Sequence, residues 1–383
     1  MGLSIGVLKE TLAGERRVAI TPKVIDVLTK AGAEVLVEAG AGLESGYPDD
    51  DYIAKGAKIA PSAAAVAEAS QILLTVRVPA PGGLVKAGQI VIGMADPLSD
   101  PQLAGQYAQA GATLFSLELV PRITRAQSMD VLSSMASIAG YKAVLIAASA
   151  LPRLFPMMST AAGTVPPARV LVIGAGVAGL QAIATARRLG AVVSGYDVRA
   201  AVKEQIESLG AKFVSITLGA SGEGQGGYAR ALTEEEIRSQ REQMSAVLKE
   251  QDVVITTAAV PGRKAPILVT RDMVYVMNRG SVVVDLAAER GGNCELTCAG
   301  ETIVDHGVTI IGPVNLPATV PNHASQMYGR NIVTFLKNMM TKEGALNIDV
   351  SDEITRDSLV VRDGAIVNTR VQELLGSPVQ ASS

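Results

Sequence analysis

The segment that most constrains the fold is the glycine-rich run GAGVAG at residues 174–179. It directly follows the apolar run RVLVI (169–173) and precedes a helical pattern, which is the strand–turn–helix context of a dinucleotide-binding fingerprint. Gly174 would allow the tight turn, Gly176 the close approach of a pyrophosphate, and Gly179 close packing of helix on strand. The alternative is a glycine-rich turn without a ligand.

An acidic residue ends the next strand pattern, AVVSGYD (191–197), about 20 residues beyond the fingerprint. Asp197 is expected to accept hydrogen bonds from both ribose hydroxyls and to repel a 2′-phosphate, so the sequence favours NAD(H) over NADP(H). Arg199 is close enough in sequence to neutralise that carboxylate. The predicted cofactor-binding residues of this turn are Gly174, Ala175, Gly176, Gly179 and Asp197.

Strand and helix patterns alternate along most of the chain, which indicates parallel sheets covered by helices. The sequence predicts an α/β fold of two Rossmann-like, doubly wound parallel-sheet domains joined by a long helix, with a cleft between them. We place the N-terminal domain at residues 1–130, completed by the C-terminal tail at 320–383. The NAD(H)-binding domain is placed at residues 131–319.

Two segments of this pattern connect or complete the domains. A continuous helical pattern rich in Ser, Ala and Met runs from Gln127 to about Leu151 and is long enough to tie two domains together. After Ser325 the tail contains an amphipathic helical pattern and then a short pair of strands near residues 358–369, which we expect to pack on the first domain.

Composition excludes several classes of function. A net charge of −3 and a pI of about 5.6 give no electrostatic footprint for nucleic acid. The apolar run AVLIAASAL (143–151) is shorter than the roughly 20 residues of a membrane-spanning helix, so no membrane insertion is expected. The chain has two histidines and two cysteines, and Cys294 and Cys298 lack metal-ligand spacing. We therefore predict reduced thiols and no metal site.

Two further segments each allow two interpretations. The run TLGASGEGQGGYARA (217–231) is either a surface linker or a lid over the nucleotide, with Tyr228 and Arg230 near its end. The run PRITRAQSMD (121–130) is either an ordinary helix start, with its charges solvated or capping, or a polar binding segment.

The motifs resemble those of the alanine dehydrogenase and nicotinamide nucleotide transhydrogenase superfamily, over nearly the whole chain. The matching motifs are ERRVAITP (15–22), AGTVPPARVLVIGAGVAGLQAIATARRLGA (161–191) and DLAAERGGN (285–293). The resemblance implies the fold described above and one of two activities.

Alanine dehydrogenases in this superfamily bind pyruvate with an Arg, a Lys and a catalytic His, helped by an Asp. These four positions fall on Arg17, Arg77, Asp96 and Glu289. Without the His this chain would lack the acid–base group for interconverting amine and carbonyl. The resemblance therefore disfavours alanine dehydrogenase, which remains the alternative.

The run PRITRAQSMDVLSS is similar to a loop of the NAD(H)-binding component of the proton-translocating transhydrogenases. The resemblance assigns the hydride-transfer site to Arg122, Gln127, Asp130 and Ser133. On one continuous helix, Gln127, Asp130 and Ser133 would share a side. Hydride passing between two nicotinamides needs alignment and exclusion of water rather than an acid or base, and these polar groups suit that task.

The resemblance also implies further cofactor contacts and partners. The contacts are Val177, Asp197, Val198, Arg199, Gly227, Tyr228, Gln243 and Ala259. The implied activity is hydride transfer from NADH to NADP⁺, with NADP(H) held on a partner beta subunit, coupled to proton translocation by a membrane-spanning subunit. A homodimer at the cytoplasmic face of the inner membrane, made as a separate polypeptide, is expected. A redox-sensing NAD-binding module without catalysis is a third interpretation.

Overall fold

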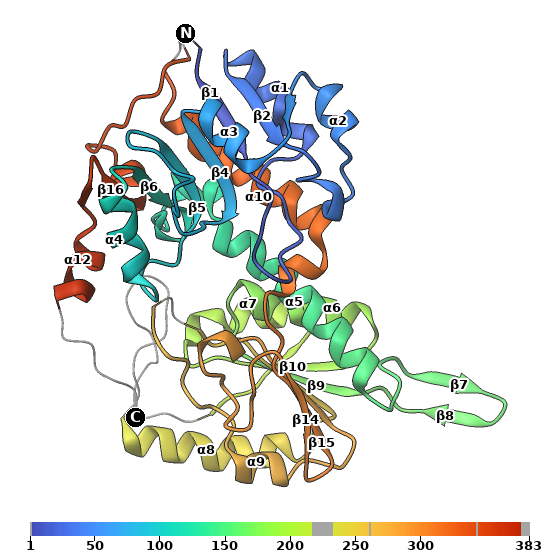
Figure 1. Ribbon diagram of the computed structural model, residues 1–383. Helices are drawn as coiled ribbons and strands as arrows, with labels where there is room; N and C mark the ends of the chain where they lie inside the picture. The colour runs from blue at the N-terminus through green and yellow to red at the C-terminus, as the bar shows by residue number, and fades with distance from the viewer. Residues whose placement is uncertain (1, 217–232, 260–261, 342–343, 377–383) are drawn as a thin grey trace. The chain divides into compact units, whose positions relative to one another are not determined.

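The computed structural model describes residues 2–216, 233–259, 262–341 and 344–376, which fall into two compact units (Figure 1). Unit 1 comprises residues 1–135 and 317–383, and unit 2 comprises residues 136–316. Each unit is built on a mostly parallel sheet covered by helices. The predicted α/β, Rossmann-like architecture is confirmed.

Unit 1 contains an eight-stranded sheet in the order β17-β16-β6-β5-β4-β1-β2-β3. Its strands are β1 Ser4–Val7, β2 Glu34–Glu38, β3 Lys58–Ala60, β4 Ile72–Arg77, β5 Ile90–Met94, β6 Thr113–Ser116, β16 Leu359–Arg362 and β17 Ala365–Ile366. The chain builds from β1 to the β3 edge and then continues on the other side at β4, so the switch point of this doubly wound sheet lies between β1 and β4. The short strands expected near residues 358–369 are β16 and β17, which extend the sheet in antiparallel fashion from β6.

Helices from both ends of the chain complete unit 1. They are α1 Pro22–Lys30, α2 Asp49–Ile53, α3 Ala63–Ala69, α4 Pro101–Gln109, α10 Pro321–Asn338, α11 Glu353–Ser358 and α12 Thr369–Gly376. Three 3₁₀ helices lie between them, η1 Leu43–Ser45, η2 Leu117–Leu119 and η3 Thr124–Met129. Helix α10 enters the core through Tyr328 and Phe335, both fully buried, and Phe335 meets Phe115 edge-to-face at 5.6 Å between ring centroids.

Unit 2 contains a seven-stranded sheet in the order β11-β10-β9-β12-β13-β15-β14. Its strands are β9 Arg169–Ile173, β10 Val192–Tyr196, β11 Lys212–Phe213, β12 Val253–Thr256, β13 Val282–Asp285, β14 Thr302–Asp305 and β15 Val308–Ile311. Its helices are α6 Val177–Arg188, η4 Ala200–Val202, α7 Lys203–Ser208, α8 Glu234–Leu248, α9 Arg271–Tyr275 and η6 Ala288–Arg290. The 3₁₀ helix η7, Leu316–Thr319, lies at the boundary with unit 1. A separate ribbon of β7 Met158–Thr160 and β8 Gly163–Val165 extends away from this sheet (Figure 1).

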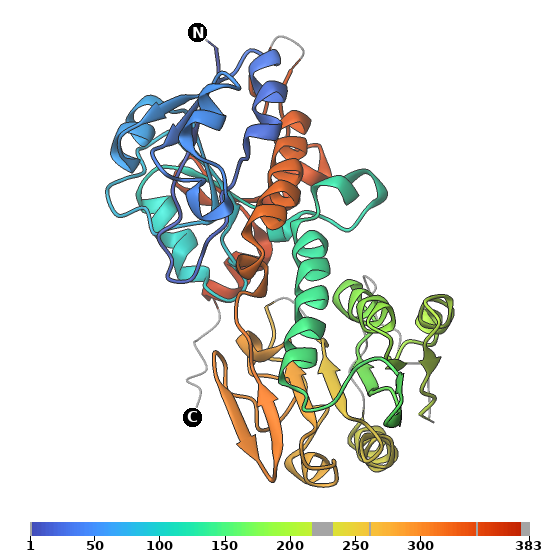
Figure 2. The same ribbon diagram turned by 90° about the vertical axis from the view of Figure 1, so that its right-hand side faces the viewer.

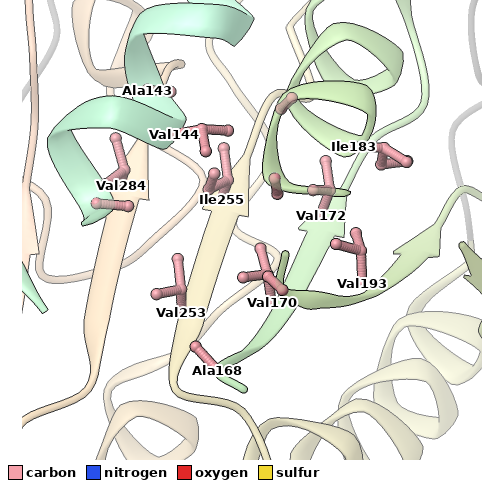
Figure 3. Close-up of a cluster of buried hydrophobic side chains, with 14 of the residues drawn as sticks. Ala143, Val144, Ala168, Val170, Val172, Ile183, Val193, Val253, Ile255 and Val284 are labelled. Carbon is pink, nitrogen blue, oxygen red and sulfur yellow. The ribbon is translucent and has the colours of Figure 1, made fainter. Parts of the chain in front are cut away.

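The central strands of unit 2 are apolar on both faces because helices cover both. Alternate residues face opposite sides, so each strand contributes to two separate cores. The first core, shown in Figure 3, contains Val170, Val172, Val253, Ile255 and Val284. The second contains Leu171, Ile173, Val254 and Val283.

The long helix begins later than the sequence predicts. Helix α5 spans Val131–Ala150, and the preceding residues form the 3₁₀ helix η3. Asp130 between them has an extended backbone, with ψ at 93°. The expectation that Gln127, Asp130 and Ser133 share one side of a continuous helix is therefore wrong, because the helical path is interrupted at Asp130.

Helix α5 is also longer and more apolar than its contiguous apolar run suggests. By length and composition alone it is the one helix in the described part of the chain that could cross a membrane. No such helix was expected from the sequence, because Ser and Gly residues interrupt the run. A core helix passes the same test, and Ala143, Val144 and Ala147 of α5 are fully buried in the first core of unit 2.

Candidate functional site

The glycine-rich turn of unit 2 lies between β9 and α6, and each of its glycines meets a different steric demand. Gly174 has a φ of +98°, which favours glycine, and an added Cβ would lie 2.6 Å from Thr257 Oγ1. A Cβ on Gly179 would lie 1.8 Å from Gly174 O, so the close packing of helix on turn requires glycine. A Cβ on Gly176 would meet no heavy atom within 4 Å, so the backbone at the start of α6 faces open space.

That open space is suited to an anion. The first turn of α6 presents backbone N–H groups without helical partners, at the positive end of the helix dipole. Val177 in this turn is 42% exposed, although it is apolar. The local geometry therefore fits the pyrophosphate of a dinucleotide.

Asp197 follows β10, and its carboxylate is occupied by donors of this chain. Its Oδ2 accepts from Ala175 N at 2.8 Å and Arg199 Nη2 at 2.8 Å, and its Oδ1 accepts from Arg199 N and Nε, both at 2.9 Å. Burial opposes ionisation, but the hydrogen bonds from Arg199 and Ala175 hold the pKa of Asp197 below its usual value. The neutralising pair that the sequence left open is thus present, and ribose hydroxyls would have to compete with the Arg199 side chain.

The loop after β12 packs on the glycine-rich turn and is held by a buried amide. Thr257 Oγ1 donates to Gly174 O at 3.0 Å. The fully buried Asn293 accepts from Ala258 N at 2.9 Å and donates to Ala258 O at 2.8 Å and Pro266 O at 2.9 Å. Its side chain thus pairs with both polar groups of Ala258, as a neighbouring strand would.

Asp285, at the end of β13, organises the same region. Its fully buried carboxylate accepts five hydrogen bonds of 2.7–3.0 Å. The donors are Thr256 Oγ1, Thr297 Oγ1 and the backbone N–H groups of Ala287, Asn293 and Cys294. In the sequence, Asp285 and Asn293 were noted only as members of a motif. A polar residue directly after a buried parallel strand was the available signal.

The remaining predicted contacts of unit 2 lie around this turn in the chain. Val198 joins Asp197 to Arg199, and Ala259 is exposed one residue beyond Ala258. Gln243 on α8 donates to Ser239 Oγ at 3.1 Å. Gly227 and Tyr228 lie outside the described residues.

In unit 1, the predicted transfer residues line one cavity of about 400 Å³. Its walls come from residues 121–133, here called the cavity segment: Pro121, Arg122, Ile123, Thr124, Ala126, Gln127, Asp130 and Ser133. Ala126 and Met129 anchor this segment in the core, whereas Arg122 and Gln127 are exposed. The volume falls in the range of ligand pockets.

Asp130 and Ser133 bond to one another. Asp130 Oδ1 accepts from Ser133 N at 2.8 Å and Oδ2 accepts from Ser133 Oγ at 2.6 Å, which is the pattern of an N-cap at the start of α5. The helix-start interpretation therefore holds for this pair. A cap and a cavity wall are compatible roles, because the cap fixes where the pair lies.

The positions that match the alanine dehydrogenase site have a different character. Arg17 is 2% exposed and forms a bidentate pair with Glu15, at 2.7 Å and 2.6 Å. Arg77 Nε lies 3.9 Å from Glu15 Oε2. Asp96, at the His position, has a φ of +46°, and its N–H donates to Glu118. In unit 2, Glu289 accepts from the N–H of Asn315.

Glu10 makes the stability of unit 1 sensitive to pH. Its carboxylate follows β1 and accepts from the N–H groups of Val76 and Arg77 at the end of β4. Burial raises the pKa of Glu10 from 4.5 to about 7, against the effect of these hydrogen bonds. The folded chain thus binds the extra proton between these values, and the associated stability is lost as pH rises through about 7.

We expect Glu10→Gln to remove this dependence. The urea midpoint of the parent chain should fall between about pH 5 and about pH 8 relative to that of the variant, because glutamine cannot ionise. Parallel pH profiles for the two proteins would contradict the assignment.

Two sequence profiles match the chain. The alanine dehydrogenase/PNT N-terminal domain matches residues 6–139, and the alanine dehydrogenase/PNT C-terminal domain matches residues 143–369. The chain belongs to the alanine dehydrogenase/PNT family.

Members of both branches of the alanine dehydrogenase/PNT family are similar to this chain. The first of the separate polypeptides of NAD(P) transhydrogenase subunit alpha in Rhodospirillum rubrum is 45% identical over 376 residues, covering 96% of this chain and 98% of the relative. The crystal structure of transhydrogenase from Sinorhizobium meliloti is 44% identical, with a TM-score of 0.84 over 96% of this chain and 99% of that chain. Alanine dehydrogenase of Mycobacterium tuberculosis is 30% identical over 98% of both chains. Within the alanine dehydrogenase/PNT family, the homologues thus support a transhydrogenase component.

Proposed function

We propose that this chain is the NAD(H)-binding component of a proton-translocating transhydrogenase. The observation that carries the proposal is the cavity of unit 1, whose polar lining includes Arg122, Gln127, Asp130 and Ser133. The set matches the transhydrogenase pattern residue by residue. The 45% identity to a transhydrogenase subunit supports the same choice.

In this proposal NADH is a substrate. Its C4 hydride passes to NADP⁺ held on a partner component, which yields NAD⁺ and NADPH with no proton exchanged at the reacting carbons. The chain's own task is to bind NADH, to orient the nicotinamide and to exclude water. The start of α6 would bind the pyrophosphate, and Arg122 and Gln127 would orient the nicotinamide end.

The partners and the cellular place follow from the same proposal. We propose an NADP(H)-binding partner and a membrane-spanning partner that carries protons, with this chain as a homodimer on the cytoplasmic face of the inner membrane. An alanine dehydrogenase activity is less well supported, because Asp96 stands where an imidazole would be needed and Glu289 where an Asp would be.

Two assays test the proposal together. The full chain, mixed with NADH and an NADP⁺-loaded partner domain, should produce NADPH. The same chain with NAD⁺ and L-alanine should produce no NADH. Reduction of NAD⁺ by alanine, with no transfer in the first assay, would reverse the assignment. Tight NADH binding with neither reaction would favour the redox-sensing interpretation.

Nucleotide choice is expected to depend on the Asp197–Arg199 pair. The parent chain should bind NADH more tightly than NADPH, and Asp197→Ala should reduce that preference by about 10-fold or more, or on the order of 2 kcal/mol. The substitution removes a ribose acceptor and releases Arg199 toward a 2′-phosphate. Titration calorimetry with both nucleotides measures the change. Equal affinities in the parent chain would refute the NAD(H) assignment.

A further inference from the structure

A helix from the C-terminal stretch of the chain supports the cavity segment. Helix α10 lies against η3, and Figure 2 shows α10 (orange) beside the segment (teal) that precedes α5. Asn331 of α10 is 6% exposed, and its Nδ2 donates to Ser128 O at 2.8 Å. Ser128 directly follows Gln127, so this bond reaches the backbone next to a cavity-lining side chain.

The bond fixes a backbone group near the end of a short helix. The last carbonyls of a helix have no following turn to donate to them, so they need donors from elsewhere. Beyond Ser128 the path changes to the extended Asp130. An amide anchored in the core therefore determines where η3 ends and how Gln127 is presented to the cavity.

The other half of the Asn331 amide has no role that its surroundings explain. Within the described part of the chain, Asn331 Oδ1 is buried without a hydrogen-bond partner. Turning the amide over would place this oxygen against Ser128 O, so the orientation is fixed by the acceptor. A buried acceptor without a partner is costly, and stability alone would favour an apolar residue here.

A second set of contacts at the rim of η3 is exposed and contributes less. Arg125 pairs with Asp352 and donates to Asn338 Oδ1, and Asn338 Nδ2 donates to Asp352. The Arg125 side chain is 54% exposed, so water and salt weaken this pair. The buried bond of Asn331 is therefore the contact that can hold the cavity segment rigidly.

We propose that Asn331 is a positioning residue for hydride transfer, acting through Ser128 O to place Gln127. The proposal rests on the proposed function. It predicts a separation between rate and stability that a structural asparagine would not produce. Asn331→Leu, of similar volume, loses the bond to Ser128 but also removes the unpaired acceptor, so folding should change little.

The matched control is Asn322, on the same helix. Its Nδ2 also donates to a backbone carbonyl at 2.8 Å, but that carbonyl belongs to Ser45, outside the cavity segment. Asn322→Leu makes the same chemical change in the same unit. Its effect on transfer should be small.

The experiment compares the parent chain, Asn331→Leu and Asn322→Leu, each with NADH and an NADP⁺-loaded partner domain. Asn331→Leu should slow single-turnover transfer by about 10-fold to 100-fold, with the NADH Kd and the urea midpoint close to those of the parent chain. A normal rate in Asn331→Leu, or equal slowing in both variants, would overturn the proposal.

Amide hydrogen exchange separates this proposal from the proposed function. Residues 124–130 should exchange faster in Asn331→Leu than in Asn322→Leu, whether or not a partner is present. If the parent chain transfers no hydride, the proposed function fails, and equal exchange in the two variants would still overturn the positioning role.

Discussion

Replacing Gln127 by asparagine is expected to slow hydride transfer by about 100-fold while changing the NADH Kd by less than about three-fold. The substitution keeps the amide and shortens the side chain by one methylene, so a group that aligns the nicotinamide moves by about 1 Å. Binding should persist, because the pyrophosphate site is in unit 2, at the start of α6. Single-turnover mixing with an NADP⁺-loaded partner gives the rate, and calorimetry gives the Kd.

The control for this prediction is Gln106→Asn. Gln106 is an exposed glutamine on α4 and does not line the cavity. Its shortening should leave both quantities unchanged. An unaltered rate in Gln127→Asn, or equal losses of rate and affinity, would show that Gln127 does not act by alignment.

Removing the Asp285 carboxylate should produce the largest loss of stability. Asp285→Ala leaves three backbone N–H groups buried without acceptors, those of Ala287, Asn293 and Cys294. Each such group costs about 1–3 kcal/mol, so the free energy of unfolding of unit 2 should fall by about 3 kcal/mol or more. Amide exchange of β12 and β13 reports on unit 2 separately from unit 1.

Thr297→Val is the graded comparison for this prediction. It removes one hydroxyl donor from Asp285 and should cost about 1 kcal/mol. NADH affinity should follow the same order, because the Asp285 and Asn293 contacts hold the loop that packs on Gly174. A cost below about 1 kcal/mol for Asp285→Ala would mean that the five hydrogen bonds are not a major source of stability.

The features that the sequence predicted are those determined locally. The glycine-rich turn could be inferred because its requirements, a positive φ at Gly174 and closest packing at Gly179, act within six residues. The parallel sheets could be inferred because both faces of a strand such as β12 are buried, which produces an unbroken apolar run. The Asp197–Arg199 pair was visible as a possibility because its members are two positions apart.

The features that the sequence did not reveal depend on distant partners or on small changes of backbone path. Asn293 is 35 positions from Ala258, and Asn331 is 203 positions from Ser128. No periodicity links such pairs, and asparagine in either place looks like an ordinary polar residue. The start of α5 was misplaced because a 3₁₀ turn and an α-helix have similar apolar spacing, and only the extended Asp130 separates them.

The composition of unit 1 from two separated stretches of chain affects how it is made. During synthesis on the ribosome, β6 emerges long before its neighbour β16, and all seven strands of the unit 2 sheet are translated in between. The edge of β6 and the apolar surface that later covers Tyr328 and Phe335 therefore stay unpaired throughout that interval. The inserted unit can fold first, and the unit that contains the N-terminus becomes complete last.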